Sequence, residues 1–144
     1  MKADVIEIAE YLINNSAEGL ISDALKIPSV EDQIVRLNLS QLAKFQDSEG
    51  VMLADIGGEY SEQTQKKKGA GPRDVNLRDT GEYWSTFRET PVSGGYEIDS
   101  NPLKGDENLL DKYGEDVEGL QKKNIDKADG IIENQVWKTA EEKV

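Results

Sequence analysis

The chain has 144 residues, enough for one domain with a hydrophobic core and too few for two of ordinary size. Hydrophobic residues make up 36% and charged residues 32% of it, so the chain is more polar than an average globular domain, and we expect part of it to order only on assembly. The absence of cysteine and histidine excludes disulfides, thiolate nucleophiles, Cys/His zinc sites and imidazole-based triads.

Charge is unevenly distributed along the sequence. The net charge is −12, and residues 51–104 are nearly balanced, with 7 basic and 9 acidic groups, whereas both ends of the chain are acidic. A molecule of this charge repels nucleic acid unless a basic element is segregated from the rest. No apolar run approaches the ~20 residues of a membrane span, and the acidic N-terminal segment is unlike a signal peptide. We therefore expect no membrane partner and synthesis in a cytoplasm.

The first predicted helix runs from Ala3 to Lys26, where apolar residues recur at a spacing near 3.6. Pro28 ends it, because the residue before a proline avoids the helical region. The polar stretch Asn14–Ser16 has two readings: a solvent-facing patch of one helix, or a break at which Ser16 caps a second helix.

A further helix is predicted from Ser29 to Asp47, with Ser29 as its N-cap and Asp32 at the capping-box position. Two amphipathic helices joined by a short proline-containing link indicate a helical hairpin over residues 1–48.

Residues 49–104 are predicted to form a sheet region that contains a mobile basic loop at 62–75. A short strand or extended segment is expected near Val51 to Leu53. Glycines and Pro72 follow the lysine run of the loop and oppose regular structure. The basic side chains of this loop could bind phosphates or an acidic protein surface, and the alternative is an ordinary solvated loop. They are Lys66, Lys67, Lys68 and Arg73.

The densest structural signal lies between residues 76 and 100. Asp79, Thr80 and Gly81 form a compact turn, and Glu82 has the spacing of a capping box with Asp79. A short helical turn should follow. Three crowded aromatic residues are expected to be core or interface anchors: Tyr83, Trp84 and Phe87.

A β-hairpin is predicted directly after these aromatic residues. Ser93–Gly95 provides the turn, because glycine adopts positive φ without steric cost. From Tyr96 to Ser100, apolar or small residues alternate with acidic ones, which is typical of a half-buried strand.

The tripeptide Asp79-Thr80-Gly81 also occurs in aspartic proteases, where two carboxylates share one proton and activate water. A dimer could pair two copies of Asp79 in this way. The context favours a capping turn instead, because Arg78 stands where those enzymes have an apolar strand. A dimeric hydrolase built on Asp79 is therefore the less favoured alternative, and we expect no enzyme, no cofactor and no metal site.

The C-terminal region, residues 105–144, is predicted to be helical. A short helix spans Asp106 to Tyr113 and stops at Gly114, and a long helix spans Lys122 to Val144. Gly130 within the long helix indicates a kink or a close contact. The fold class is thus a single α+β domain with an N-terminal helical hairpin, a small antiparallel sheet and a long C-terminal helix.

The order of several short motifs between residues 34 and 140 resembles tailed-bacteriophage virion morphogenesis proteins. The motifs are Asp47-Ser48-Glu49-Gly50, Tyr60-Ser61 with Thr64 before the lysine run, Leu77-Arg78-Asp79-Thr80-Gly81 with Ser85 after it, Leu110, Lys112-Tyr113-Gly114, Asp116 and Gly119-Leu120. The bulky pair Tyr83-Trp84 and the missing basic run at the C-terminus depart from that family.

The resemblance implies a structural subunit of the neck or tail, of the tail-completion or head–tail joining type. Its expected partners are copies of itself in a ring, neighbouring neck or tail proteins, and DNA that passes through without sequence-specific contact. It would be located in the virion and assembled in the host cytoplasm. The alternative from the residues alone is a non-enzymatic interaction module of a bacterial or prophage system.

Overall fold

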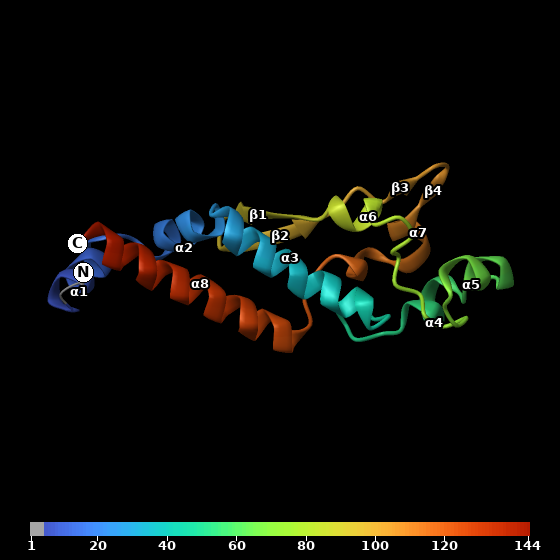
Figure 1. Ribbon diagram of the computed structural model, residues 1–144. Coiled ribbons are helices and arrows are strands. Elements are labelled where there is room, and N and C mark those ends of the chain that lie inside the picture. The colour runs from blue at the N-terminus through green and yellow to red at the C-terminus, as the bar shows by residue number, and fades with distance from the viewer. Residues whose placement is uncertain (1–4) are drawn as a thin grey trace.

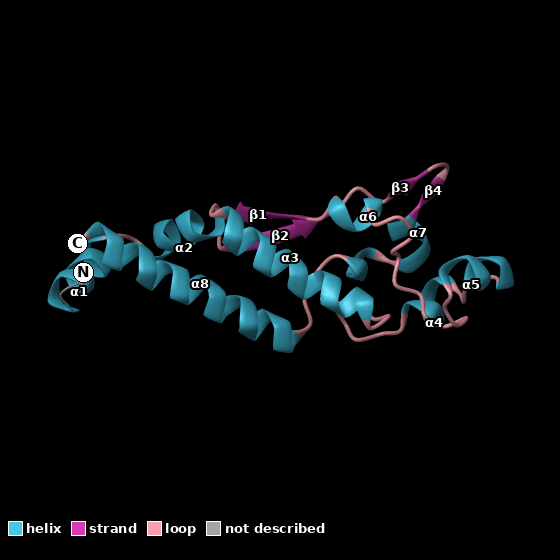
Figure 2. Ribbon diagram, in the orientation of Figure 1, coloured by secondary structure: helices cyan, strands magenta, loops and turns pink. Residues whose placement is uncertain are grey.

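The computed structural model describes residues 5–144 and has the α+β architecture expected from the sequence, with N-terminal helices, a β1–β2 hairpin and a long C-terminal helix. Figure 1 shows the arrangement of its elements, and Figure 2 distinguishes helices from strands. The elements in chain order are α1 (Val5–Asn14), α2 (Ala17–Leu25), α3 (Pro28–Ala43), α4 (Leu53–Gly57), α5 (Glu62–Lys68), α6 (Glu82–Ser85), β1 (Arg88–Val92), β2 (Gly95–Asp99), β3 (Leu103–Lys104), β4 (Glu107–Asn108), α7 (Leu109–Tyr113), the 3-10 helix η1 (Glu115–Val117) and α8 (Lys122–Lys143).

The molecule is elongated (Figure 1). Helix α8 packs along α1, α2 and α3, and the β1–β2 hairpin contacts α2 and α3. Helices α4 and α5 and the β3–β4 hairpin lie at one end of the long axis, while α1 and the last turns of α8 lie at the other. None of the described helices combines the length and the apolar character that crossing a membrane requires.

The N-terminal polar stretch is a helix break, which confirms the second of its two readings. Ser16 is extended, and its Oγ accepts a hydrogen bond from the Gly19 amide at 3.1 Å, so it caps α2. The predicted helix start at Ala3 lies outside the described residues. The predicted cap at Ser29 is wrong: α3 begins at Pro28, after an extended Ile27, because proline is preorganised for the first helical position.

The β1–β2 hairpin confirms the strand pattern predicted for Tyr96 to Ser100. The strands are antiparallel, and Glu89 pairs with Ile98 and Val92 with Gly95. Ile98 is buried and its sequence neighbours are exposed. Gly94 in the turn has a φ of 82°, a conformation that favours glycine.

Several local predictions need correction. The strand or extended segment expected at Val51–Leu53 is an isolated bridge between Gln46 and Met52, after which helix α4 begins at Leu53. The helix expected from Asp106 begins only at Leu109, because Glu107 and Asn108 form β4. The predicted loop at residues 62–75 is helical in its first half, as α5. The long helix α8 continues through Gly130, where an added Cβ would meet no atom within 4 Å, so the close contact, one of the two alternatives expected there, is absent.

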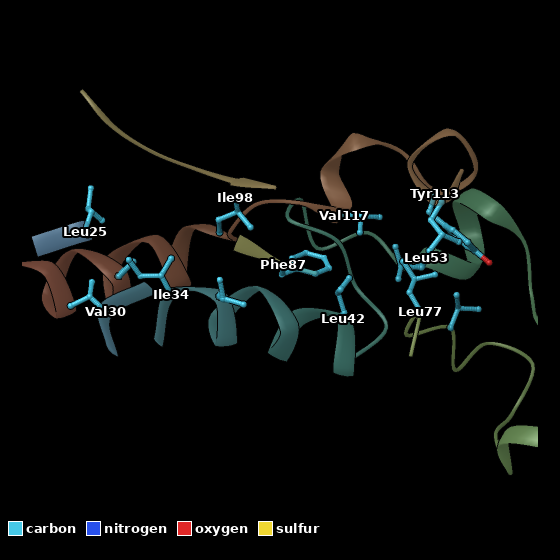
Figure 3. Packing of buried hydrophobic residues seen from close by; sticks show 14 of the residues in the cluster. Leu25, Val30, Ile34, Leu42, Leu53, Leu77, Phe87, Ile98, Tyr113 and Val117 are labelled. Carbon is cyan, nitrogen blue, oxygen red and sulfur yellow. The ribbon is translucent and has the colours of Figure 1, made fainter. Parts of the chain in front are cut away.

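The hydrophobic core is a narrow strip that follows the long axis (Figure 3). Leu25, Val30 and Ile34 lie toward one end of it, and Leu53, Leu77 and Tyr113 toward the other, with Phe87 between them. Because a strip has few layers, many side chains on both flanks of the core are only half-buried.

A network of buried carboxamides joins α3 to the start of α8. Asn38 is fully buried; its Nδ2 donates to the Val117 carbonyl at 2.9 Å and its Oδ1 accepts from the Gly119 amide at 2.7 Å. The Gln41 side chain donates to the Gly119 carbonyl at 2.9 Å and accepts from the Gln121 amide at 2.7 Å and from Asn124 Nδ2 at 2.8 Å. The network thus satisfies backbone groups of the segment that turns into α8.

Gln41→Ala should lower the free energy of unfolding by about 2–4 kcal/mol, because it leaves several buried donors and acceptors unsatisfied. Urea unfolding measures this change. Gln33→Ala is the matched control on the same helix: its Nε2 makes an exposed bond to the Ser29 carbonyl, and its loss should cost at most about 0.5 kcal/mol. Equal effects of both substitutions would contradict the role of the network.

Glu89 is a buried carboxylate without a hydrogen-bond partner. Its side chain lies on the inner face of the β1–β2 hairpin, where the residue is 3% exposed and neither oxygen is bonded within the described chain. Burial, and then the negative charge of Glu31 on α3, raises the pKa of Glu89 to about 7. The fold therefore favours the protonated acid.

Stability should consequently fall as the pH rises. Between the ordinary pKa of 4.5 and the folded value of about 7, the folded chain retains a proton that the unfolded chain has released, so the stability contribution is lost across this window. Glu89→Gln should remove this slope and should stabilise the protein by roughly 1–3 kcal/mol above the window and little below it. Thermal unfolding as a function of pH measures it, and Glu97→Gln on the exposed face of the hairpin is the control. A mutant slope equal to that of the wild type would contradict the account.

Candidate functional site

The predicted partner-binding lysines lie in the last turn of helix α5. Ser61 caps the start of this helix, and Gly69 ends it in the left-handed conformation that glycine favours. Lysines at a helix C-terminus are stabilised by the partial negative charge of the exposed carbonyls. The lysine turn, which we define as Lys66, Lys67 and Lys68, is therefore part of a defined helix.

Lys68 is held within the chain. Its Nζ donates to Tyr60 Oη at 2.8 Å and to Asn76 Oδ1 at 3.1 Å, and it lies 4.6 Å from the centre of the Tyr60 ring. These partners are neutral, so the positive charge is positioned without being neutralised. Among residues 5–144, no carboxylate forms an ion pair with Lys66, Lys67 or Lys68.

Arg73 is engaged by two acids. Its guanidinium binds Asp55 Oδ1 at 2.6 Å and Glu59 Oε2 at 3.3 Å, and these hydrogen bonds raise its pKa. The prediction grouped Arg73 with the three lysines, but its charge is compensated locally. It fastens the segment after α5 to α4.

Asp79 is paired with a lysine from the β3–β4 hairpin. Lys104 Nζ lies 3.1 Å from Asp79 Oδ2, and this hydrogen bond, helped by the charges of Lys104 and Lys67, lowers the pKa of Asp79. The capping box predicted between Asp79 and Glu82 is absent. Gly81 is the N-cap of α6, and the Thr80 hydroxyl accepts from the Glu82 amide at 3.3 Å instead.

The lysine turn and the Asp79 turn, predicted as separate features, line one cleft of about 340 Å³. Its floor includes Leu77, Leu109 and Tyr113, and its walls carry both signs of charge. The charged lining residues are Glu59, Lys67, Lys68, Asp79, Lys104, Glu107 and Lys112. Such a cleft can accept an anionic group near the lysine turn. Nothing in the sequence indicated that Lys104 and Lys112 belong to this cleft, because they lie in β3 and α7, far from the lysine turn in the sequence.

The three aromatic residues are tied into the fold. Phe87 is 1% exposed and meets the Tyr83 ring edge-on, with 5.2 Å between the ring centres. Tyr83 Oη lies 2.8 Å from Ser100 Oγ, and burial raises the pKa of Tyr83 to about 12. Trp84 Nε1 donates to the Asn76 carbonyl at 2.9 Å, and the Arg78 guanidinium lies over the half-buried Trp84 ring, 5.4 Å from its centre. Phe87 serves as a core anchor, and the other two connect α6 to its surroundings.

A second candidate surface lies away from the lysine cleft, toward the α1 end of the molecule. An apolar groove of about 480 Å³ runs between α2, the β1–β2 turn and α8. Its lining residues are Ala17, Leu20, Ile21, Gly94, Gly95, Tyr96, Asp129, Ile132, Glu133 and Val136. Ile132 belongs to the hydrophobic core, and Val136 and Tyr96 pack against it, so the groove is an open edge of the core. Sequence periodicity cannot distinguish a fully buried helix face from one that also lines an open groove.

Within residues 5–144, no three acidic side chains converge in a group that could hold a metal ion. Comparisons with protein-family models, with curated proteins and with solved structures found no match to this chain.

Lys104→Met should raise the pKa of Asp79 toward its ordinary value, because it removes the hydrogen bond that contributes most to the lowering. Side-chain carboxyl chemical shifts followed through a pH titration measure this pKa. Lys112→Met is the matched control, since Lys112 pairs with Glu107 and not with Asp79. An unchanged Asp79 pKa in Lys104→Met would show that another group holds the carboxylate ionised.

Proposed function

We propose that the protein is a self-assembling structural subunit, of the tail-completion or head–tail joining type that the motif resemblance implies, and that it forms a ring. The observation that carries the proposal is its surface area. The chain exposes 8937 Å², whereas a compact monomer of 16.0 kDa exposes about 7400 Å². The excess of about 1500 Å² corresponds to roughly two faces of ~800 Å², and a subunit in a closed ring has two such interfaces.

Exposed apolar side chains support burial against other chains. Among the described residues, large apolar side chains at both ends of the molecule remain in solvent, and a compact monomer would cover most of them. The exposed fractions are 68% for Val5, 81% for Ile13, 67% for Leu103 and 45% for Trp137.

The charge distribution suits a ring around DNA. A net charge of −12 repels the phosphate backbone, so a lumen lined by the acidic body would let DNA pass without strong attachment. The lysine turn makes no ion pair among residues 5–144 and is the part best suited to hold an acidic protein surface.

Two other functions have less support. A monomeric interaction module would use the lysine cleft, but this function does not explain the excess exposed surface. A hydrolase built on Asp79 needs a carboxyl group that retains a proton, whereas the Lys104 hydrogen bond lowers the pKa of Asp79.

The purified chain should form closed oligomers of one size, because two complementary faces per subunit close when the rotation between subunits permits. Sedimentation velocity over a range of concentrations, followed by negative-stain electron microscopy, measures the mass and shape. A strict monomer at tens of micromolar would overturn the proposal and would favour the interaction module.

A further inference from the structure

We propose that copies of this chain meet head to tail: the lysine turn and Leu103 of one copy bind the acidic-rimmed apolar groove of the next. This inference rests on the proposed self-assembly and specifies its contact. It follows from two surfaces of complementary chemistry at opposite ends of the molecule.

The groove between α2, the β1–β2 turn and α8 is apolar inside and acidic at its edge. Ile21, Ile132 and Val136 contribute aliphatic surface, while Asp129 and Glu133 on α8 are exposed at the side. Neither acid has an ion-pair partner among residues 5–144. The lysines of α8 nearest to them in sequence, Lys127 and Lys138, lie roughly 120–140° around the helix from Ile132, at about 100° per residue. The groove therefore presents uncompensated negative charge around an apolar surface.

The other end carries the lysine turn and an exposed apolar side chain. Among residues 5–144 the lysine turn makes no ion pair, although Asp79 lines the same cleft as Lys67. Lys67 and Lys104 share this cleft, which places the β3–β4 hairpin beside α5. Leu103, in that hairpin, is 67% exposed and is the most exposed large apolar side chain at this end among the described residues. An exposed leucine together with the nearby lysine turn has the chemistry that an acidic-rimmed apolar groove accepts.

These two surfaces cannot meet within one molecule. Helix α5 and the β3–β4 hairpin lie at one end of the long axis, and the groove lies toward the other, where α2 and α8 pack together (Figure 1). Complementary patches at different places on a subunit produce a heterologous contact, which closes into a ring or continues as a filament. A second copy of the chain is therefore the occupant that the structure itself supplies.

Charge reversal on each side tests the contact. Lys66→Glu/Lys67→Glu and Asp129→Lys/Glu133→Lys should each weaken self-association about tenfold or more, because like charges then face each other. An equimolar mixture of the two variants should recover association, since each supplies the surface that the other lacks. Wild-type association should also weaken with rising salt concentration, as the charges are screened. Sedimentation velocity measures all four samples, and circular dichroism shows that the variants are folded.

Lys122→Glu/Lys123→Glu is the matched control. It changes the net charge as much as the first variant does, but at the exposed start of α8, away from both surfaces, and it should associate like the wild type. If it dissociates equally, net charge rather than a specific contact governs assembly. If the wild type assembles and both reversal variants still assemble, the head-to-tail contact is wrong and the proposed function survives. If the wild type is monomeric, both are wrong.

A groove-filling variant tests the apolar part independently of charge. An added Cβ at Gly95 would meet no atom within 4 Å, and its φ lies outside the left-handed region, so the chain itself tolerates a side chain there. Gly95→Leu should therefore fold and should weaken association by occupying the groove. Leu103→Ser should have the same effect from the other side. Unchanged association in both variants would show that the groove receives no side chain from the neighbouring copy.

Discussion

The buried carboxamides of Asn38 and Gln41 form the polar joint between α3 and the segment that leads into α8. They bind backbone groups around Gly119 and Gln121, which lie about 80 residues away in the sequence and lead directly into α8. No side chain caps the start of α8, so the bond from Asn124 to Gln41 fixes where this helix begins its path along α3. The position of α8 in turn creates the groove beside α2. The geometry of the candidate interface therefore depends on two buried amides of α3.

The core explains why such a polar joint is tolerable. A strip of aliphatic and aromatic side chains along one axis packs the elements together at every point of its length. It is too narrow to bury the outer sides of the helices. Carboxamides that are fully paired add directional contacts where apolar surface is scarce. Glu89 is the exception, a polar group on the inner face of the hairpin without compensation, and its raised pKa records the cost.

The sequence predicted elements with strong periodicity and failed where contacts distant in the sequence decide. The long helix at Lys122 and the strand around Ile98 were recognisable from their spacing of apolar residues. The lysine run was predicted to be a loop because Gly69 and Pro72 follow it. Ser61 instead caps a short helix that includes the lysines and ends at Gly69. The cleft itself could not be predicted, since Lys104 reaches Asp79 only through the fold of the β3–β4 hairpin. The groove could not be predicted for a related reason. The apolar face of α8 has the pattern of a core-facing helix, but the short β1–β2 hairpin covers only part of it.

The strip-shaped core has a consequence for local opening. A layered core makes unfolding cooperative because most elements touch most others, whereas here α1 contributes only Ile8 to the buried residues and α5 contributes none. Local unfolding free energy scales with such buried contacts. Amide protons at the two ends should thus exchange with solvent well before those of α3 and the middle of α8. Of the two surfaces proposed for docking, the one that includes α5 would therefore gain more backbone order from association than the groove, which α2 and the middle of α8 line.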